Sequence, residues 1–196
     1  TDFEKTSSMA VVEGVLDSEA GGAVAAFRAI VQDENTDYLN PILMTGSTVL
    51  VDDDLVGEFI SECRNWINRK GLKIELVDVI EGPYHDIRGS GKDWVPRNYI
   101  EMITDLFQWG VTNCIVVTRG LLVEGWDETK NNVLIDLTSV TTEMSIYQLR
   151  GRSIRLDSEW PEKVANNWDI ICVAEEVAKG VDDYDRFKKK HKQLYG

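Results

Sequence analysis

The feature that most constrains the fold of this chain is the alternation of short apolar runs with amphipathic segments. The apolar runs are rich in β-branched residues and do not alternate with polar ones, as in strands that are buried on both faces. The segments between them place apolar residues at helical spacing. This pattern predicts a parallel sheet covered by helices. We expect strands over 42–51, 73–79, 114–118, 133–137 and 170–174. Helices are expected over 7–17, 23–31, 141–149 and 181–195, and two more begin after Asp54 and at Pro96. A polar loop is expected over 81–96.

Composition limits the range of functions. The chain has 196 residues, enough for one sizeable core. Its net charge of −13 argues against a broad basic surface for nucleic acid, so phosphate contacts would have to be local. The cysteines, Cys63, Cys114 and Cys172, are odd in number and far apart, which favours a reducing cytoplasm over a disulfide framework or zinc site. No apolar run is long enough to span a bilayer, so no membrane partner is expected.

Two segments carry recognisable motifs. Residues 148–155 read Gln-x-x-Gly-Arg-x-x-Arg, and residues 118–127 read Thr-Arg-Gly-Leu-Leu-Val-Glu-Gly-Trp-Asp. In their order, and in the predicted strand between them, they resemble motifs VI and V of superfamily 2 helicases of the DEAD/DEAH type found in bacteria. The resemblance is strongest over residues 99–173. It implies an α/β fold, a three-layer RecA-like domain with a mostly parallel sheet and helices on both faces.

The resemblance also implies roles for particular residues. Arg152 and Arg155 would be catalytic and would contact the γ-phosphate of ATP, which a missing N-terminal RecA-like lobe of the same chain would hold together with Mg²⁺. Arg119 departs from the family, in which many relatives carry aspartate. The remaining implied contacts are Gln148, Gly125 and Asp127 to ATP, and Thr118, Arg119, Gly120, Thr45 and Gly46 to nucleic acid, with DNA favoured over RNA.

Physical chemistry gives these residues both a functional and a structural interpretation. Phosphoryl transfer builds charge on the equatorial oxygens, and a guanidinium aimed there can be worth about 10³–10⁵ in rate. A helix would put Arg152 and Arg155 on one face, and Gly151 would let the backbone approach closely. The alternatives are a solvated basic helix end for the arginines, a hydroxyl that bonds its own backbone for Thr118, and a bulged strand for Thr45 and Gly46.

Other motifs are incomplete. Residues 89–93 end like a phosphate-binding loop, but Asp93 replaces the required Ser or Thr, and Asp86 stands where the first Gly should be. The two histidines, His85 and His191, lie far apart without a ligand cluster, so no metal site is expected. Because the sequence has no complete phosphate-binding loop, the chain alone should neither bind ATP tightly nor hydrolyse it.

These observations lead to one main interpretation and two alternatives. We expect a helical lead-in over 1–40, a helicase lobe over 41–180 and an amphipathic C-terminal helix over 181–196, which together form half of an ATP-driven helicase or translocase. The first alternative is a non-catalytic helicase-like docking module. The second is a self-contained doubly wound enzyme, which would need a glycine-rich phosphate loop of its own.

Overall fold

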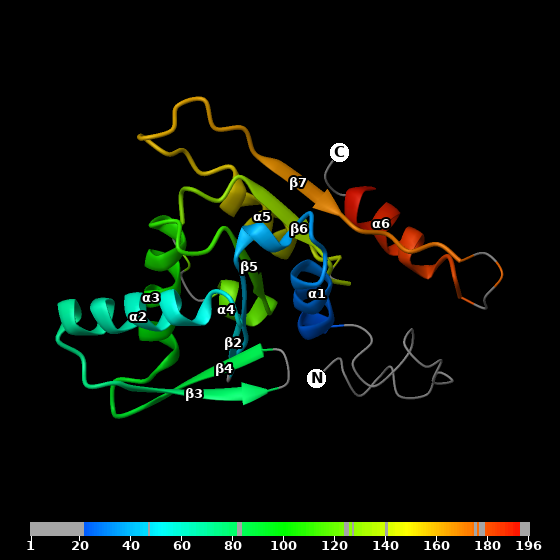
Figure 1. The fold of residues 1–196 in the computed structure, drawn as a ribbon. Coiled ribbons are helices and arrows are strands. Elements are labelled where there is room, and N and C mark those ends of the chain that lie inside the picture. The colour runs from blue at the N-terminus through cyan, green and yellow to red at the C-terminus, as the bar shows by residue number, and fades with distance from the viewer. Residues whose placement is uncertain are drawn as a thin grey trace. The chain divides into compact units, whose positions relative to one another are not determined.

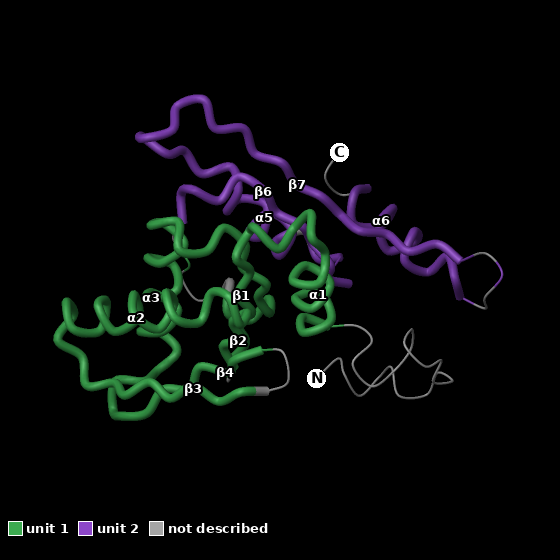
Figure 2. The backbone as a smooth tube through the Cα atoms, in the orientation of Figure 1, with its two compact units in different colours: residues 1–126 green, residues 127–196 purple. Residues whose placement is uncertain are grey.

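The structure is a computed structural model that describes residues 22–46, 48–81, 84–123, 126, 128–139, 141–174, 176 and 179–192. The helix expected over 7–17 lies outside these residues. The chain divides into two compact units, residues 1–126 and 127–196, shown in green and purple in Figure 2. In the described part of the chain, no helix has both the length and the apolar character needed to cross a membrane.

The first unit contains a five-stranded sheet with helices packed beside it (Figure 1). Its strands follow the order β3-β4-β2-β1-β5 across the sheet. In chain order the elements are α1 (Gly22–Val31), η2 (Asp37–Leu39), β1 (Pro41–Met44), β2 (Val49–Asp52), α2 (Val56–Lys70), β3 (Glu75–Glu81), β4 (Tyr84–Ser90), α3 (Pro96–Gln108), β5 (Cys114–Val117) and α4 (Arg119–Val123).

The sheet contradicts the expected fold class. Among its described strands, β1 and β5 are parallel, while β1–β2, β2–β4 and β3–β4 are all antiparallel. The expectation of a three-layer RecA-like domain with a mostly parallel sheet is therefore wrong, and the protein has a mixed α/β fold with a mostly antiparallel sheet.

Two local features of the chain account for the difference between the expected and the observed sheet. The apolar run over 42–51 is a hairpin instead of one strand, because a turn interrupts it: the Thr45 amide donates to the Thr48 carbonyl at 2.8 Å, and the Thr48 amide donates to Thr45 Oγ1 at 3.1 Å. The segment 81–96, expected to be a loop, contains β4, which pairs with β3 along seven register positions. Each change adds an antiparallel neighbour to the sheet.

The helices of this unit follow the sequence pattern more closely. The helix expected after Asp54 is confirmed as α2, whose residues Phe59, Cys63 and Trp66 are buried, as is Leu55 just before it. Pro96 is the first residue of α3, where its fixed φ suits a helix start. Trp66 Nε1 donates to Asp105 Oδ2 at 2.7 Å, which joins α2 to α3. On the sheet, a core cluster of Phe27, Leu43, Leu50 and Tyr84 holds α1 in place.

The second unit is smaller. Its sheet consists of two parallel strands, β6 (Val133–Asp136) and β7 (Asn166–Asp169), and α5 (Glu143–Ser153) packs on both. The helix α6 (Asp182–Lys192) follows. The last strand was expected over 170–174 but ends at Asp169. Two polar residues, Asn166 and Asn167, open this strand, so an apolar pattern alone does not reveal it.

Candidate functional site

The parallel pairing of β1 with β5 brings two predicted site segments together. Met44 and Val117, the last residues of these strands, are partners in the register. The Thr118 amide then donates to the Met44 carbonyl at 3.3 Å. Thr45-Gly46 and Thr118-Arg119-Gly120 therefore leave the sheet side by side at the carboxyl ends of neighbouring parallel strands, the edge at which α/β proteins bind ligands.

The two turns are held in place from inside the unit and present groups to solvent. Tyr99 on α3 donates its hydroxyl to the Gly46 carbonyl at 3.1 Å, and the Leu121 amide donates to the Thr118 carbonyl at 3.1 Å. Thr118, Gly46 and Gly120 are exposed, whereas Thr45 and Arg119 are half-buried. The Thr45 hydroxyl closes its own turn by accepting from Thr48. An exposed hydroxyl and a guanidinium at one edge can bind phosphate oxygens without reading sequence.

The predicted ATP-facing residues of the second unit lie at the end of α5. Gln148 is exposed on the helix, and 9% of the Arg152 surface is accessible. Arg155 is half-buried and lies two residues past the end of α5 at Ser153, so the two arginines do not share a helix face as expected. Gly125 and Asp127 lie outside the described residues. Trp126 between them is buried and packs against Phe107, with ring centroids 6.4 Å apart.

A buried charge network that the sequence did not reveal lies at the ends of β6 and β7. Asp136 and Asp169 are register partners at the last positions of these strands. Lys190 of α6, with 4% of its surface exposed, donates to Asp136 Oδ2 at 2.5 Å and also to Asp169. Arg150 donates to Asp169 Oδ2 at 2.7 Å. Burial raises the pKa of the Asp136 carboxyl, but hydrogen bonds from Lys190 and Thr138 outweigh this and leave it below its ordinary value. The network fixes α6 to the sheet.

A second ionic cluster lies on the larger sheet. His85 on β4 contacts Asp78 Oδ1 through Nδ1 at 2.7 Å and Asp53 Oδ1 through Nε2 at 3.0 Å. The hydrogen bond with Asp78 raises the pKa of His85, and Asp53 adds to this, while burial opposes both. His85 thus links β3, β4 and the turn after β2 through contacts with two carboxylates. Among the described residues, no group of His, Cys, Asp and Glu side chains is arranged to hold a metal ion.

The glycine-rich segment 89–93 has packing reasons for its glycines. A Cβ on Gly89 would lie 2.1 Å from the Trp94 ring, and one on Gly91, whose φ is +109°, would lie 2.3 Å from the Lys73 carbonyl oxygen. The Asp93 carboxylate accepts from the Lys73 amide at 2.8 Å. These contacts explain the composition of the loop through its turn and its packing, without a bound phosphate.

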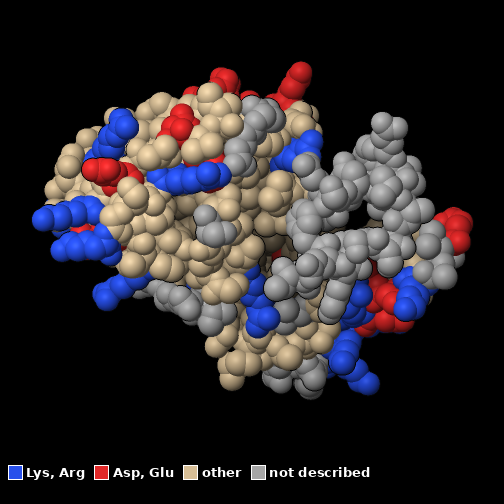
Figure 3. Space-filling model, turned by 90° about the horizontal axis from the view of Figure 1, so that it is seen from below, with Lys and Arg blue, Asp and Glu red and all other residues tan. Residues whose placement is uncertain are grey.

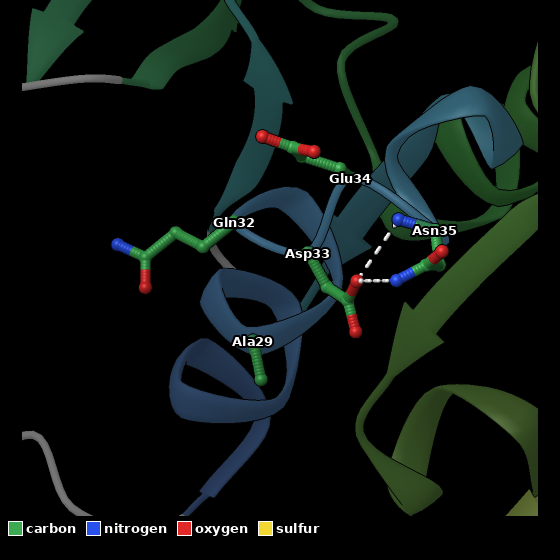
Figure 4. Close-up of a pocket in the computed structure, with 5 residues that line it drawn as sticks. All are labelled: Ala29, Gln32, Asp33, Glu34 and Asn35. Atoms are coloured by element: carbon green, nitrogen blue, oxygen red, sulfur yellow. Dashed lines mark hydrogen bonds between the residues drawn. The ribbon is translucent and has the colours of Figure 1, made fainter.

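A shallow surface depression lies at the end of α1 (Figure 4). Its lining side chains are polar, apart from Ala29, and include Gln32 and Glu34. Asp33 Oδ1 accepts from both the amide and the side chain of Asn35 at 2.9 Å, and these bonds lower the pKa of Asp33. The Asp33 carboxylate is thus engaged in forming a turn, and Glu34 is the other carboxylate in the depression.

Neither the surface charge nor the comparison with known proteins identifies a function for this chain. On the face drawn in Figure 3, the described Lys and Arg side chains form separate groups among acidic and uncharged residues. No family model, curated protein or solved structure matches this chain. The positions of the candidate residues are therefore the structural support for a function.

Gly151 offers a test of whether a ligand approaches α5. A Cβ at this position would meet nothing within 4 Å, so packing does not require glycine there. Gly151→Ala should raise the free energy of unfolding by about 0.5–1 kcal/mol, because glycine is unfavourable in helices. If the chain belongs to an ATP-driven helicase, as its sequence predicts, and phosphates approach the backbone there, the same change should lower ATP turnover about tenfold or more through misplacement.

Gly57→Ala on α2 is the matched control, since a Cβ there also meets nothing within 4 Å. Urea denaturation measures the first effect and steady-state ATP turnover the second. Equal turnover in the two variants would show that no ligand needs the space beside Gly151.

Proposed function

We propose that this chain is the arginine-bearing part of an ATP-dependent nucleic-acid motor, a helicase or translocase. One observation carries the proposal: the register of β1 with β5 sets Thr45-Gly46 beside Thr118-Arg119-Gly120 at one sheet edge. The helicase resemblance assigns both segments to the nucleic-acid backbone, although they are more than seventy residues apart in the sequence. Their juxtaposition is what a shared phosphate-binding edge requires.

Nucleic acid is proposed to bind along this edge through its phosphates. The exposed Thr118 hydroxyl and the Arg119 guanidinium supply donors, and the exposed Gly46 and Gly120 leave the backbone open to close approach. Contacts of this kind position a strand without specifying its sequence. A net charge of −13 means that attraction must come from this local edge, so affinity should be modest and salt-sensitive. DNA is the favoured partner over RNA.

ATP is proposed to be held by a separate N-terminal lobe of the same protein, which also binds Mg²⁺. Arg152 and Arg155 would act on its γ-phosphate, and Gln148, Gly125 and Asp127 would line the nucleotide. The exposed Gln148 and the open space at Gly151 leave room for phosphates beside this end of α5. Only 9% of the Arg152 surface is accessible. ATP must therefore contact Arg152 through that exposed part, or after a local shift of the neighbouring residues. A cytoplasmic location is part of the same proposal.

The nucleic-acid edge can be tested on the 196-residue chain itself. Fluorescence anisotropy with a labelled single-stranded DNA at low salt should detect binding that Arg119→Glu weakens equally for all sequences. Losing one phosphate contact should also reduce the slope of log affinity against log salt by about 1. Thr118→Val should weaken binding in the same direction.

Arg64→Glu provides the control, because Arg64 is an exposed residue of α2 in the same unit and the charge change is identical. Equal weakening by both charge reversals would mean that only net charge matters. That result, or the absence of binding in a folded wild type, would remove the assignment of this edge.

A further inference from the structure

Lys163 joins the two predicted ATP segments through its side chain. Its Nζ donates to the Arg155 carbonyl at 2.8 Å and also to the Thr129 carbonyl. Arg155 ends the Gln-x-x-Gly-Arg-x-x-Arg motif, and Thr129 lies two residues after Asp127 at the end of the other motif. One side chain thus connects backbone segments that are separated by twenty-six residues in the sequence.

Each segment also brings a buried carboxylate toward the Lys163 ammonium. Glu128 has 1% of its surface exposed and accepts from the Lys130 amide at 2.5 Å. Asp157 is buried as well and accepts from the Glu159 amide at 2.9 Å. Burial lowers the pKa of Lys163, whereas the negative charges of Asp157 and Glu128 oppose that change. The positive charge of Lys163 therefore interacts favourably with a buried carboxylate from each segment.

The path of the chain between Asp157 and Lys163 keeps the ammonium in place. The Trp160 amide donates to the Asp157 carbonyl at 3.2 Å, and the Lys163 amide donates to the Trp160 carbonyl at 3.1 Å. These two turns return the chain to Arg155. The Lys163 Nζ donates to two main-chain carbonyls, so this side chain fixes the backbone. Its effect on ATP would be exerted through Arg155.

We propose that Lys163 is a positioning residue, which fixes the backbone of Arg155 against that of Thr129 and thereby sets where Arg155 lies at the proposed nucleotide. This inference rests on the proposed function. The sequence motifs do not include Lys163, and its role follows from the two carbonyl contacts and the two buried carboxylates.

Steady-state ATP turnover of the protein that includes the ATP-binding lobe tests this role. Lys163→Met should lower kcat between about 10- and 100-fold, as misplacement of a reacting group does, and leave KM for ATP within about twofold. Lys163→Arg, which keeps a cation and several donors, should recover most of the turnover. Lys130→Met is the control, because Lys130 lies in the same loop but pairs with the exposed Glu159 at 3.8 Å.

A double-variant cycle separates positioning from general damage to the fold. If Lys163 acts through Arg155, Lys163→Met should cost far less turnover in an Arg155→Ala background than in the wild type. Hydrogen exchange in the 196-residue chain should quicken together at 129–131 and 155–158 in Lys163→Met, with α2 and α3 unchanged. Additive losses in turnover, or unchanged exchange at both segments, would overturn the proposal.

Failure of this inference can be told apart from failure of the proposed function. Normal turnover in Lys163→Met, measured beside an Arg152→Ala variant that has lost turnover, removes Lys163 alone. Normal turnover in both variants removes the motor assignment and the inference with it. If Lys163→Met does not fold, Lys163→Gln and the exchange measurement on Lys163→Arg decide the question, since Lys163→Arg should show wild-type exchange at both segments.

Discussion

Replacing Arg152 with alanine is expected to lower nucleic-acid-stimulated ATP turnover by about 10³-fold or more, the effect of removing an arginine finger. The guanidinium would stabilise charge that appears on the transferred phosphoryl group only in the transition state. Binding of ATP should therefore persist while turnover is lost. Arg152→Lys should rescue poorly, because an ammonium cannot reproduce the planar donor pattern. The measurement is stimulated turnover alongside equilibrium binding of ATP.

Only 9% of the Arg152 surface is exposed, so replacing Arg152 can also destabilise the fold. The loss of turnover must therefore be distinguished from the effect of destabilisation. Urea denaturation of the 196-residue variant gives that separation, since a folded variant with wild-type midpoint cannot lose turnover through unfolding. Arg64→Ala on α2 is the matched arginine control and should leave turnover unchanged. A folded Arg152→Ala variant with normal turnover would contradict the role of the arginine.

Replacing Lys190 with methionine is expected to destabilise the 127–196 unit by about 3–5 kcal/mol, because removing one partner leaves buried charge uncompensated. Asp136 and Asp169 would both lose the ammonium, and α6 would lose its attachment to the sheet. Lys188→Met is the control on the same helix. Its ion pair with Asp185 is exposed, so its loss should change the free energy of unfolding far less than the loss of Lys190. Hydrogen exchange across β6, β7 and α6 at increasing urea concentration measures both variants.

The pH dependence of this effect has a defined sign. The pKa of Asp136 is held below its ordinary 3.8, so its contribution to stability is complete above that value and is lost as the pH falls through the lower folded pKa. The acid loss should be smaller in Lys190→Met, since the variant no longer has the ammonium that depresses this pKa. A Lys190→Met variant as stable as Lys188→Met would contradict the buried network.

The sequence predicts the helices better than the sheet, for a physical reason. An apolar stripe such as Phe59, Cys63 and Trp66 repeats over several turns and fits one structure only, while a proline such as Pro96 marks a helix start. An apolar run such as 42–51 fits one buried strand or a tight hairpin equally well. What decides between them is whether the Thr45–Thr48 turn closes, which depends on one backbone–backbone hydrogen bond and one bond from the Thr48 amide to the Thr45 hydroxyl.

In the candidate site too, the sequence predicts local features better than contacts between distant segments. The sequence places Thr118 at the end of a predicted strand but Thr45 inside one. In the structure β1 ends at Met44, and the parallel register then brings the two threonines together. The contacts of Lys163 and Lys190 depend on long-range packing that no spacing rule reveals, because each lysine meets carboxylates or carbonyls from distant segments.

The most direct test of the proposed motor function is ATP turnover by the wild-type chain joined to the proposed ATP-binding lobe, with and without single- and double-stranded DNA and RNA. We expect turnover that nucleic acid stimulates, with DNA more effective than RNA and with stimulation that weakens as salt rises. Turnover that no nucleic acid changes, in a folded protein that binds ATP, would contradict the assignment and would favour a docking role for this chain.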